Sequence, residues 1–418
     1  MFRRSSSEHG AVFIHVAIGL LVLLAFGAFV MDYGMLWVSR SQVQASADAG
    51  ALAGAVALAH DNVVDRADRA RNVAWNTGIR TRVWGDAPGI VPTSPYDGPG
   101  CGTAGQNSCV RVDAFRDGSN GSTLLPTFLA NLFGLSTQHV KAMAVARAGV
   151  GNSTTCLKPW AVVDKWTEHY PTEGAPWDQT SMYDKYIISG SNKGQVDPAI
   201  PIPDSYAAPT DSSVGTGFHP YNPDGSYTPD YGRQLTLKAG QNSNDFAFGS
   251  GWFMALSLGG SCGTGGACYN ENIKNCVGIR YSIGEEVPVD TEPGDMVGPT
   301  RQAVATDTAS DGGGASLVNQ DPGAHWDEGT QSVQGSAFSS SPRIVAIPLV
   351  NPDEIAQAQA GGRTTVKISN IAGFFIEGMA ADNKGVVGRL VNMPALEVTG
   401  AGNIDPNAAF LYVIQLVR

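Results

Sequence analysis

The longest hydrophobic run of the chain lies near its N-terminus. From Gly10 to Met31, 22 successive residues carry no formal charge, and His15 is the one polar interruption. As a helix this run would be roughly 33 Å long, enough to cross a hydrocarbon core about 30 Å thick. It is longer than the apolar core of a cleaved secretory signal, and the residues that follow it form a poor cleavage site. The pattern therefore predicts a retained transmembrane anchor.

The helical pattern continues beyond the apolar run with no turn signal. No Pro occurs between Met1 and Asp86, so we expect one helix over about residues 11–60, on the order of 75 Å long. Its outer half consists mostly of Ala, Gly and Ser, and Asp48 is the only charged residue between Arg40 and Asp61. The scarcity of charge indicates that this half is covered on most sides.

Small side chains allow helix backbones to approach closely. We therefore expect a close helix contact at Ala47, Gly50, Ala51 and Gly54. Two partners are open, namely the sheet of the same domain or identical helices in a filament or membrane complex. An ionisable residue within a span normally faces protein, so His15 either contacts a partner or is a neutral side chain that lipid tolerates.

The next part of the chain reads as a small α+β module. Residues 61–78 have apolar positions on one helical face, and Gly78 suits the C-cap. Residues 86–108 are rich in Pro, Gly and Asn and are expected to form a loop. The remaining segments are "CVRVDAF" and "HVKAMAVARAGV", both alternating as strands, and "LPTFLANLFGL", a short helix beginning near Pro126.

From residue 152 onward, strand-like segments dominate. They are separated by Gly-rich and Pro-Asp-Gly loops, with "NPDGS" as a turn and "RQAVATDTAS" as one helix. The fold class is therefore α+β, with three parts: an anchor and Ala-rich helix (1–61), a small α+β module (62–151) and a mainly β outer domain (152–418). The expected strands of the outer domain are "KYIISG", "NDFAFGSGWFMALSL", "CVGIRYSI", "PRIVAIPLV", "TTVKISNIAGFFIEGM", "GVVGRLVNM" and "AFLYVIQLV".

The N-terminal segment resembles a known family. Residues 10–59 are similar to the N-terminus of the TadE/TadG-like proteins of Tad (tight adherence) pilus assembly, in which an apolar anchor precedes Asp-Tyr-Gly and then an Ala-Asp-Ala-rich helix. The positions that match this pattern are Asp32, Tyr33, Gly34, Gln42, Gln44, Ala47, Asp48, Ala49, Ala51, Leu52 and Ala53. The resemblance continues through "LPTFLANLFGLSTQHVKAMAVARAG", "CLKPWAVVDKW", "PGDMVGPT" and "SPRIVAIPLVNPDE".

The resemblance implies a pilus-assembly role, with two departures. Type IV-like pilins are usually cut after a Gly by a prepilin peptidase, and a Glu usually occupies the fifth position of the mature chain. A cut between Gly10 and Ala11 would place His15 there, so processing at this bond is not favoured. Some TadG relatives carry a von Willebrand A domain with a D-x-S-x-S metal loop. No such loop occurs here, so metal-dependent adhesion is not implied.

Charge and cysteine content place the bulk of the chain outside the cytoplasm. Arg3 and Arg4 precede the anchor, so the N-terminus is expected in the cytoplasm and the rest in the periplasm or at the cell surface. A net charge of −11 argues against a broad basic surface for nucleic acid. An even number of exported cysteines favours disulfides. Fifteen pairings are possible; short Gly-rich loops favour Cys101–Cys109 and Cys262–Cys268, which leaves Cys156–Cys276, and partial pairing with a free thiol is the alternative.

No established catalytic or metal motif occurs in the sequence. The serine-hydrolase elbow, the phosphate-binding loop and the zinc motifs are all missing. We therefore expect no enzyme activity and no cofactor, although "DGSNGS" and "NPDGSYTPD" offer oxygens that could hold calcium without EF-hand spacing. "DKWTEHY" (Asp164, Glu168, His169) and "AHWDE" could form acid/base groups, but a surface position is favoured for both.

Three functions from different classes remain. The first is a non-enzymatic inner-membrane component of pilus assembly, whose partners are other pilin-like subunits or itself. The second is a structural subunit of an extracellular filament or adhesin, polymerised through the 11–60 helix. The third is an anchored enzyme or ligand-binding protein, which the missing catalytic motifs disfavour.

Overall fold

The computed structural model describes most of the chain in two compact units. The described residues are 9–60, 66–98, 101, 109–239, 246–260, 262, 265–289, 296–305, 315–338, 340–360 and 364–417. Unit 1 consists of residues up to Leu58, Asp65–Ala148 and Ile414–Arg418, and unit 2 of Ala59–Val64 and Gly149–Val413. The two units are described separately below.

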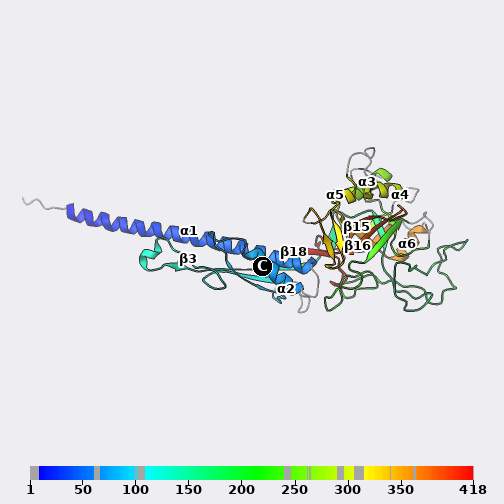
Figure 1. Cartoon of the computed structure of the whole chain (residues 1–418), viewed down its shortest axis with the longest axis horizontal. Helices are drawn as coiled ribbons and strands as arrows, with labels where there is room; N and C mark the ends of the chain where they lie inside the picture. The colour runs from blue at the N-terminus through cyan, green and yellow to red at the C-terminus, as the bar shows by residue number, and fades with distance from the viewer. Residues whose placement is uncertain are drawn as a thin grey trace, which may run out of the picture. The chain divides into compact units, whose positions relative to one another are not determined.

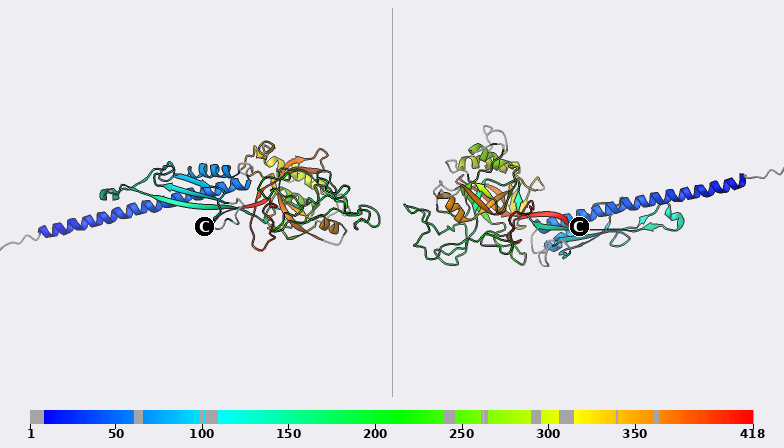
Figure 2. Two further views of the ribbon diagram at one scale, coloured as in Figure 1. Left: turned by 90° about the horizontal axis from the view of Figure 1, so that it is seen from below. Right: turned by 180° about the vertical axis from the view of Figure 1, so that it is seen from behind.

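Unit 1 is built along one continuous helix, α1 (His9–His60, 52 residues), as Figures 1 and 2 show. The helix expected over residues 11–60 is therefore confirmed. A single helix of the described residues, within Val12–Ala59, is long and apolar enough to cross a membrane, and its most apolar window is almost wholly exposed. The second helix, α2, spans Arg66–Gly78 and buries Ala70, Ala74 and Gly78; residues 61–65 lie outside the described residues.

A small antiparallel sheet completes the core of unit 1. Strands β1 (Gly89–Thr93), β2 (Cys109–Arg116) and β5 (Val140–Val150) pair in that order, and β18 (Leu411–Val417) lies next to β5. The two strands expected from alternation, β2 and β5, are confirmed. The expected loop over 86–108 was wrong in part because it contains β1. Pro92 in β1 lacks an N–H donor, which suits an edge strand and hides it in a sequence pattern.

The segment "LPTFLANLFGL" is not the α-helix that the sequence suggested. It forms part of a two-stranded hairpin, β3 (Leu125–Pro126) with β4 (Thr137–Gln138), joined through one 3-10 turn at Ala130–Phe133. Gly134 ends this turn in the left-handed conformation, with φ 83°, which favours glycine. Four residues cannot continue as an α-helix once the chain turns back to pair β4 with β3.

Unit 2 contains a closed six-stranded barrel. The ring runs β15-β14-β7-β9-β8-β16 and closes through pairing of β16 with β15, and β11 adds to β15 outside the ring. Pairs β14–β7 and β9–β8 are parallel, whereas the other pairs of the ring are antiparallel. The strands are β7 (Trp160–Val163), β8 (Gln234–Ala239), β9 (Trp252–Ala255), β11 (Glu286–Pro288), β14 (Ile344–Val350), β15 (Thr365–Met379) and β16 (Gly385–Val391).

Apolar side chains on both faces of the barrel strands form two cores. One core includes Trp166, Phe248 and Ile371, and the other includes Trp160, Phe253 and Phe374. The second core also receives residues of the helices α3 (Gly266–Lys274), α4 (Val297–Ala305) and α5 (Leu317–Gln320). The outer region is therefore mainly β, within an α+β chain.

The remaining elements are short. Helix α6 (Pro352–Gln359) begins with Pro at its first position and with Asn351 as the N-cap, whose side chain accepts from the Asp353 N–H at 2.9 Å. The long strands β14, β15, β16 and β18 were expected from the sequence, but "KYIISG" forms no strand, and β7, β8 and the helices α3, α5 and α6 were not expected. Five further short strands are described. β6 (Ser153–Thr154) pairs with β10 (Tyr281–Ser282), and β12 (His325–Asp327) pairs with β13 (Ser332–Gln334). The fifth, β17 (Met393–Pro394), lies parallel to β18.

Candidate assembly site on the N-terminal helix

Helix α1 buries one stripe of its surface against unit 1. The buried positions recur every three or four residues, the spacing of one helical face. They start at Ala28, and they include the motif residue Asp32 and the small residues of the outer half. The stripe consists of Ala28, Asp32, Met35, Ser39, Val43, Ser46, Ala47, Gly50, Ala51, Gly54 and Leu58.

The glycines of this stripe lie against the chain's own α2 and β2. A Cβ added to Gly50 would lie 2.9 Å from the carbonyl oxygen of Ala74 in α2. A Cβ on Gly54 would lie 2.9 Å from Cγ1 of Val110 in β2 and 3.1 Å from the Ala70 carbonyl oxygen. These positions therefore allow α2 and the sheet to pack closely on α1, which favours the intramolecular alternative for the small residues.

Hydrogen bonds fix the register of this contact. The Ser46 hydroxyl donates to the Gly78 carbonyl at the end of α2, at 2.8 Å. Nearer the N-terminus of α1, the Trp84 indole N–H donates to Ser39 Oγ at 2.7 Å, and the Trp84 backbone N–H donates to Gln42 Oε1 at 3.1 Å. These bonds join α1 to the end of α2 and to Trp84. The outer half of α1 therefore cannot slide against the rest of unit 1 without breaking them.

Asp32 holds the β3–β4 hairpin at the end of the apolar run. Its Oδ1 accepts from the Phe128 N–H at 2.7 Å, and its Oδ2 accepts from the N–H groups of Leu129 and Ala130 at 3.2 and 2.6 Å. The carboxylate thus satisfies the free N–H groups at the start of the 3-10 turn from a residue 96 positions earlier in sequence. The sequence identified Asp32 only as a motif residue and gave no sign of this contact.

The opposite face of α1 is exposed from the apolar half to Ala45 and again at Val56. It begins among exposed apolar residues of the first half, such as Leu20 and Leu23, and continues past Gly34 and Val38 to Val56. Ala45 on this face is exposed, and Ala49 and Leu52 are half-buried. Over residues 45–57, Ala45 and Val56 are the only exposed positions, so the expectation that the outer half is covered on most sides is confirmed. The positions of this uncovered stripe, none of them charged, are Val16, Leu20, Leu23, Gly27, Met31, Gly34, Val38, Ser41, Ala45, Ala49, Leu52 and Val56.

Other predicted residues of the helix have simple surroundings. Tyr33 is exposed and stacks on Phe29, with ring centroids 5.8 Å apart. Gly34 has open space beside it, and His15 is exposed within the apolar half. Asp48 accepts a 2.8 Å hydrogen bond from the Gln44 amide. Gly10 and Ala11 lie in the first turns of α1, but their side chains are outside the described residues, so cleavage between them stays a prediction.

Beside the end of the apolar run lies an apolar groove of about 480 Å³. Residues of α1, the hairpin turn and Trp84 line it; they are Met31, Gly34, Met35, Val38, Trp84, Phe128 and Leu129. Met31, Gly34 and Val38 belong to the uncovered stripe, so the groove is continuous with it.

The six cysteines form the three pairs that the sequence favoured. Cys101 joins Cys109 in unit 1, and in unit 2 Cys262 joins Cys268 and Cys156 joins Cys276. The Cys101–Cys109 pair packs with Val145 in a small apolar cluster of unit 1. The disulfides are therefore structural features of both units.

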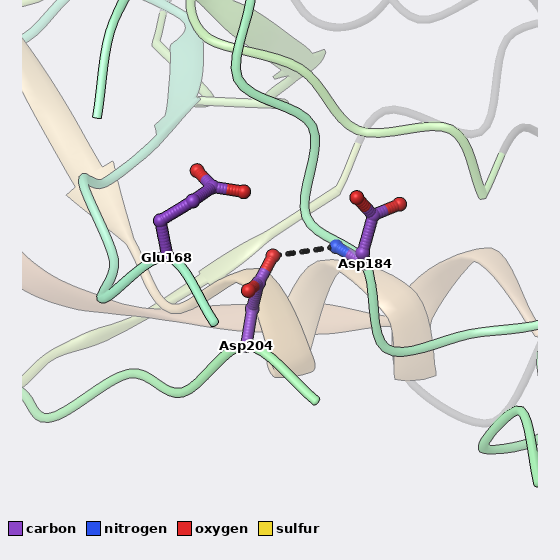
Figure 3. Close-up of side chains that lie close together, drawn as sticks. All are labelled: Glu168, Asp184 and Asp204. Carbon is purple, nitrogen blue, oxygen red and sulfur yellow. Dashed lines mark hydrogen bonds between the residues drawn. The ribbon is translucent and has the colours of Figure 1, made fainter. Parts of the chain in front are cut away.

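A group of carboxylates in unit 2 is the other notable concentration of chemistry. Glu168, Asp184 and Asp204 each offer one oxygen, and the three oxygens lie within 4.8 Å of one another (Figure 3). The expectation that Asp164 and Glu168 lie at the surface was wrong, since both are buried. Asp164 lies apart from this group: it accepts from the N–H groups of Lys165 and Phe218, both at 2.8 Å, and its full burial raises its pKa to about 6.

Burial and mutual repulsion disfavour the state in which all three carboxyl groups are ionised. Burial, followed by the charge of Asp204, raises the pKa of Glu168 to about 7, and the same two causes raise the pKa of Asp184. Asp204 itself accepts from the N–H groups of His169, Tyr170 and Asp184, at 2.6, 3.2 and 2.8 Å. Sequence reasoning missed this group because its members are 16 and 20 residues apart.

Comparison with known proteins gives one match. No curated protein and no solved structure matches the chain. The match that was found lies on α1, where it includes the apolar run, Asp32 and the small-residue half. Residues 10–57, in the N-terminal region of the chain, match the Tad family model, described as putative Flp pilus-assembly TadE/G-like.

Proposed function

We propose that the protein is a non-enzymatic, membrane-anchored component of Tad-type pilus assembly, a minor pilin-like subunit that acts through helix packing. One observation carries the proposal. Helix α1 buries one stripe on its own unit, and the opposite stripe, uncharged from Val16 to Val56, is exposed except at the half-buried Ala49 and Leu52. An exposed helix in water favours Lys, Glu and other charged residues, so an uncharged outer face suits contact with another apolar surface.

The family match of residues 10–57 supports pilus assembly as the setting. The partners in this proposal are helices of other pilin-like subunits or of further copies of the chain. Arg3 and Arg4 support a cytoplasmic N-terminus, which places both units outside the cytoplasm, where the three disulfides are stable. The lack of known catalytic motifs in the sequence supports a role without catalysis.

The test places one charge on the uncovered stripe. Ala45→Glu adds a carboxylate at an exposed position, so folding is expected to stay intact while crosslinking to partners and pilus yield fall at least tenfold. Arg40→Gln is the matched control, because Arg40 is exposed on a different face and the change also lowers the net charge by one. Equal assembly of both variants and wild type would refute helix packing through this stripe.

A second measurement separates assembly factor from filament subunit. Sheared surface fibres are collected, and the protein is quantified in the fibres and in the inner membrane. We expect most of it in the membrane. Recovery of most copies with the fibres would instead support a structural filament subunit. Protease added to spheroplasts should degrade both units, and protection of unit 2 would contradict the proposed topology.

A further inference from the structure

The carboxylate group of unit 2 lies within a long irregular segment. Between the end of β7 at Val163 and the start of β8 at Gln234, the chain forms isolated bridges and turns but no regular element. Asp204 connects three parts of this segment, because it accepts N–H groups from residues 169, 170 and 184. Segments of this length without regular structure are uncommon in compact domains and are usually functional.

Glu168 makes the group more than a set of surface acids. Its side chain is 7% exposed, and its Oε2 atom is buried with no hydrogen-bond partner. Figure 3 shows its carboxyl group near those of Asp184 and Asp204, with one oxygen turned toward Asp184 and the other turned away. Among the described residues, no Lys or Arg forms an ion pair with any of the three carboxylates. The side chains of Ser181 and Trp166 lie close enough to lower the pKa of Glu168, but no donor in the described part of the chain makes a well-formed hydrogen bond to Oε2. A buried carboxylate oxygen in this position is costly unless a proton or a cation satisfies it.

We propose that Glu168, Asp184 and Asp204 bind a calcium ion that crosslinks this segment. Calcium takes oxygen ligands at about 2.3–2.6 Å, so two ligands on opposite sides of the ion are separated by about 4.8 Å. The three oxygens lie within 4.8 Å of one another, so they are close enough to share one calcium ion. Magnesium demands near-ideal octahedral geometry and loses its water reluctantly, so a carboxylate group on an irregular segment favours calcium.

The test uses the full-length protein in detergent, stripped of metal with a chelator. Addition of 1 mM calcium chloride, a trial concentration of about the order at which extracellular modules bind calcium, should raise the melting temperature of unit 2, and metal analysis after dialysis should find a single calcium per chain. Glu168→Gln preserves side-chain size and should weaken calcium binding at least about tenfold, as loss of a metal-site residue commonly does. Magnesium at the same concentration should have a smaller effect.

Glu173→Gln is the matched control, since Glu173 is an exposed acid of the same segment. Asp184→Asn provides a second ligand change that leaves the backbone clamp of Asp204 intact. The proposal is overturned if wild type shows no calcium response, or if Glu168→Gln and Asp184→Asn respond as wild type does. In either case Glu168 is protonated, and the neutral carboxyl group needs no cation beside Asp184 and Asp204.

A second inference concerns the β3–β4 hairpin of unit 1 and rests on different residues. Asp32 fixes the hairpin turn at the point on α1 where the apolar run ends, at Met31. Phe128 and Leu135 on the hairpin are 66% and 64% exposed. From Gly118 to Gln138 the chain carries no charged residue. Figures 1 and 2 show β3 beside α1 in each view.

We infer that this hairpin rests in the headgroup region of the lipid bilayer that α1 enters. Asp32 holds the hairpin at the end of the apolar span, which is where a membrane helix leaves the bilayer. An uncharged segment with exposed Phe and Leu side chains at this level lies at the membrane–water interface. Trp37 and Trp84, 70% and 48% exposed, come from neighbouring positions of the same region and have the amphipathic ring that favours this depth. Lipid contact would hold unit 1 against the membrane surface.

The test incorporates the photoreactive residue p-benzoylphenylalanine at position 128 of the full chain in native membranes. Irradiation should give a phospholipid adduct detectable by mass. Trp75 on α2 is the control position: it is exposed, and the contact of α2 with Gly50 lies 18 residues, about 27 Å, farther along α1 than Asp32. An adduct between two copies of the chain, or equal lipid labelling at both positions, would overturn the inference.

Discussion

Replacing Gly54 by Leu tests the close packing of α1 on its own unit. The first atom of the new side chain, its Cβ, would lie 2.9 Å from Val110 Cγ1 and 3.1 Å from both the Ala70 oxygen and the Ala74 Cβ. Optimal contacts between carbon atoms lie at about 3.5–4.0 Å, so the backbones must separate or the helix must rotate. Overpacking of this kind costs about 1–3 kcal/mol per site.

A gain in helix propensity opposes this cost, since Gly is roughly 1 kcal/mol less favourable than Ala in a helix interior, with Leu close to Ala. Gly34→Leu isolates that gain, because a Cβ on Gly34 of the same helix has no atom within 4 Å. The difference between the two variants therefore measures packing alone. We expect Gly54→Leu to be less stable than Gly34→Leu by about 1–3 kcal/mol.

The assay is thermal unfolding of the full-length protein in detergent, with hydrogen exchange of the α2 peptides as a readout specific to unit 1. For a domain of 150–250 residues, each kcal/mol shifts the melting temperature by roughly 2–4 °C. Faster exchange in α2 should accompany the shift in Gly54→Leu. If both variants unfold at the same temperature and exchange alike, the short distances around Gly54 have no energetic consequence and the packing argument fails.

Three further predictions concern unit 2. Burial lowers the pKa of Lys158 to about 7, so between about pH 7 and 10.5 the unfolded chain binds one more proton than the folded chain. The free energy of unfolding should therefore rise with pH in that window, by up to about 1.4 kcal/mol per pH unit. In denaturation measured across this pH range, Lys158→Met should remove the slope. Replacing Cys156 and Cys276 by Ser opens a loop of 120 residues and should lower the free energy of unfolding by about 4–5 kcal/mol, measured by denaturant titration, whereas equal stability would show that the cross-link constrains little. Arg343 is buried and donates to the carbonyls of residues 321, 324, 376 and 377, so Arg343→Lys should destabilise by at least about 1–3 kcal/mol because an ammonium cannot reproduce the planar fork; a stability like that of wild type would contradict this.

The sequence predicted best those elements whose signal is local. Helix α1 follows from an apolar run, abundant Ala and no Pro, all visible within the segment itself. Strands β2 and β5 follow from alternation, and β14 and β15 from long apolar runs. The short barrel strands β7 and β8 were missed because four to six residues carry little periodicity, and only closure of the ring defines them.

The features that escaped prediction depend on contacts between distant residues. The 3-10 turn at Ala130–Phe133 is capped by Asp32, so no pattern near the turn could reveal its length. Glu168 looked like a surface residue because the sequence around it is polar. Its burial depends on Asp204 and on the packing of the segment between β7 and β8. A sequence can offer such carboxylates, but only the fold brings them together.

The small residues of α1 have two separate explanations, one for each face of the helix. Gly50 and Gly54 are small because α2 and β2 approach within contact distance, which requires no partner outside the chain. Ala45 lies on the opposite face and is exposed, so a Lys or Glu there would be equally compatible with helix formation. An intramolecular role therefore explains the two glycines and does not explain Ala45. The exposed positions of this face carry no charge from Val16 to Val56, and the proposed contact with another apolar helix accounts for that pattern.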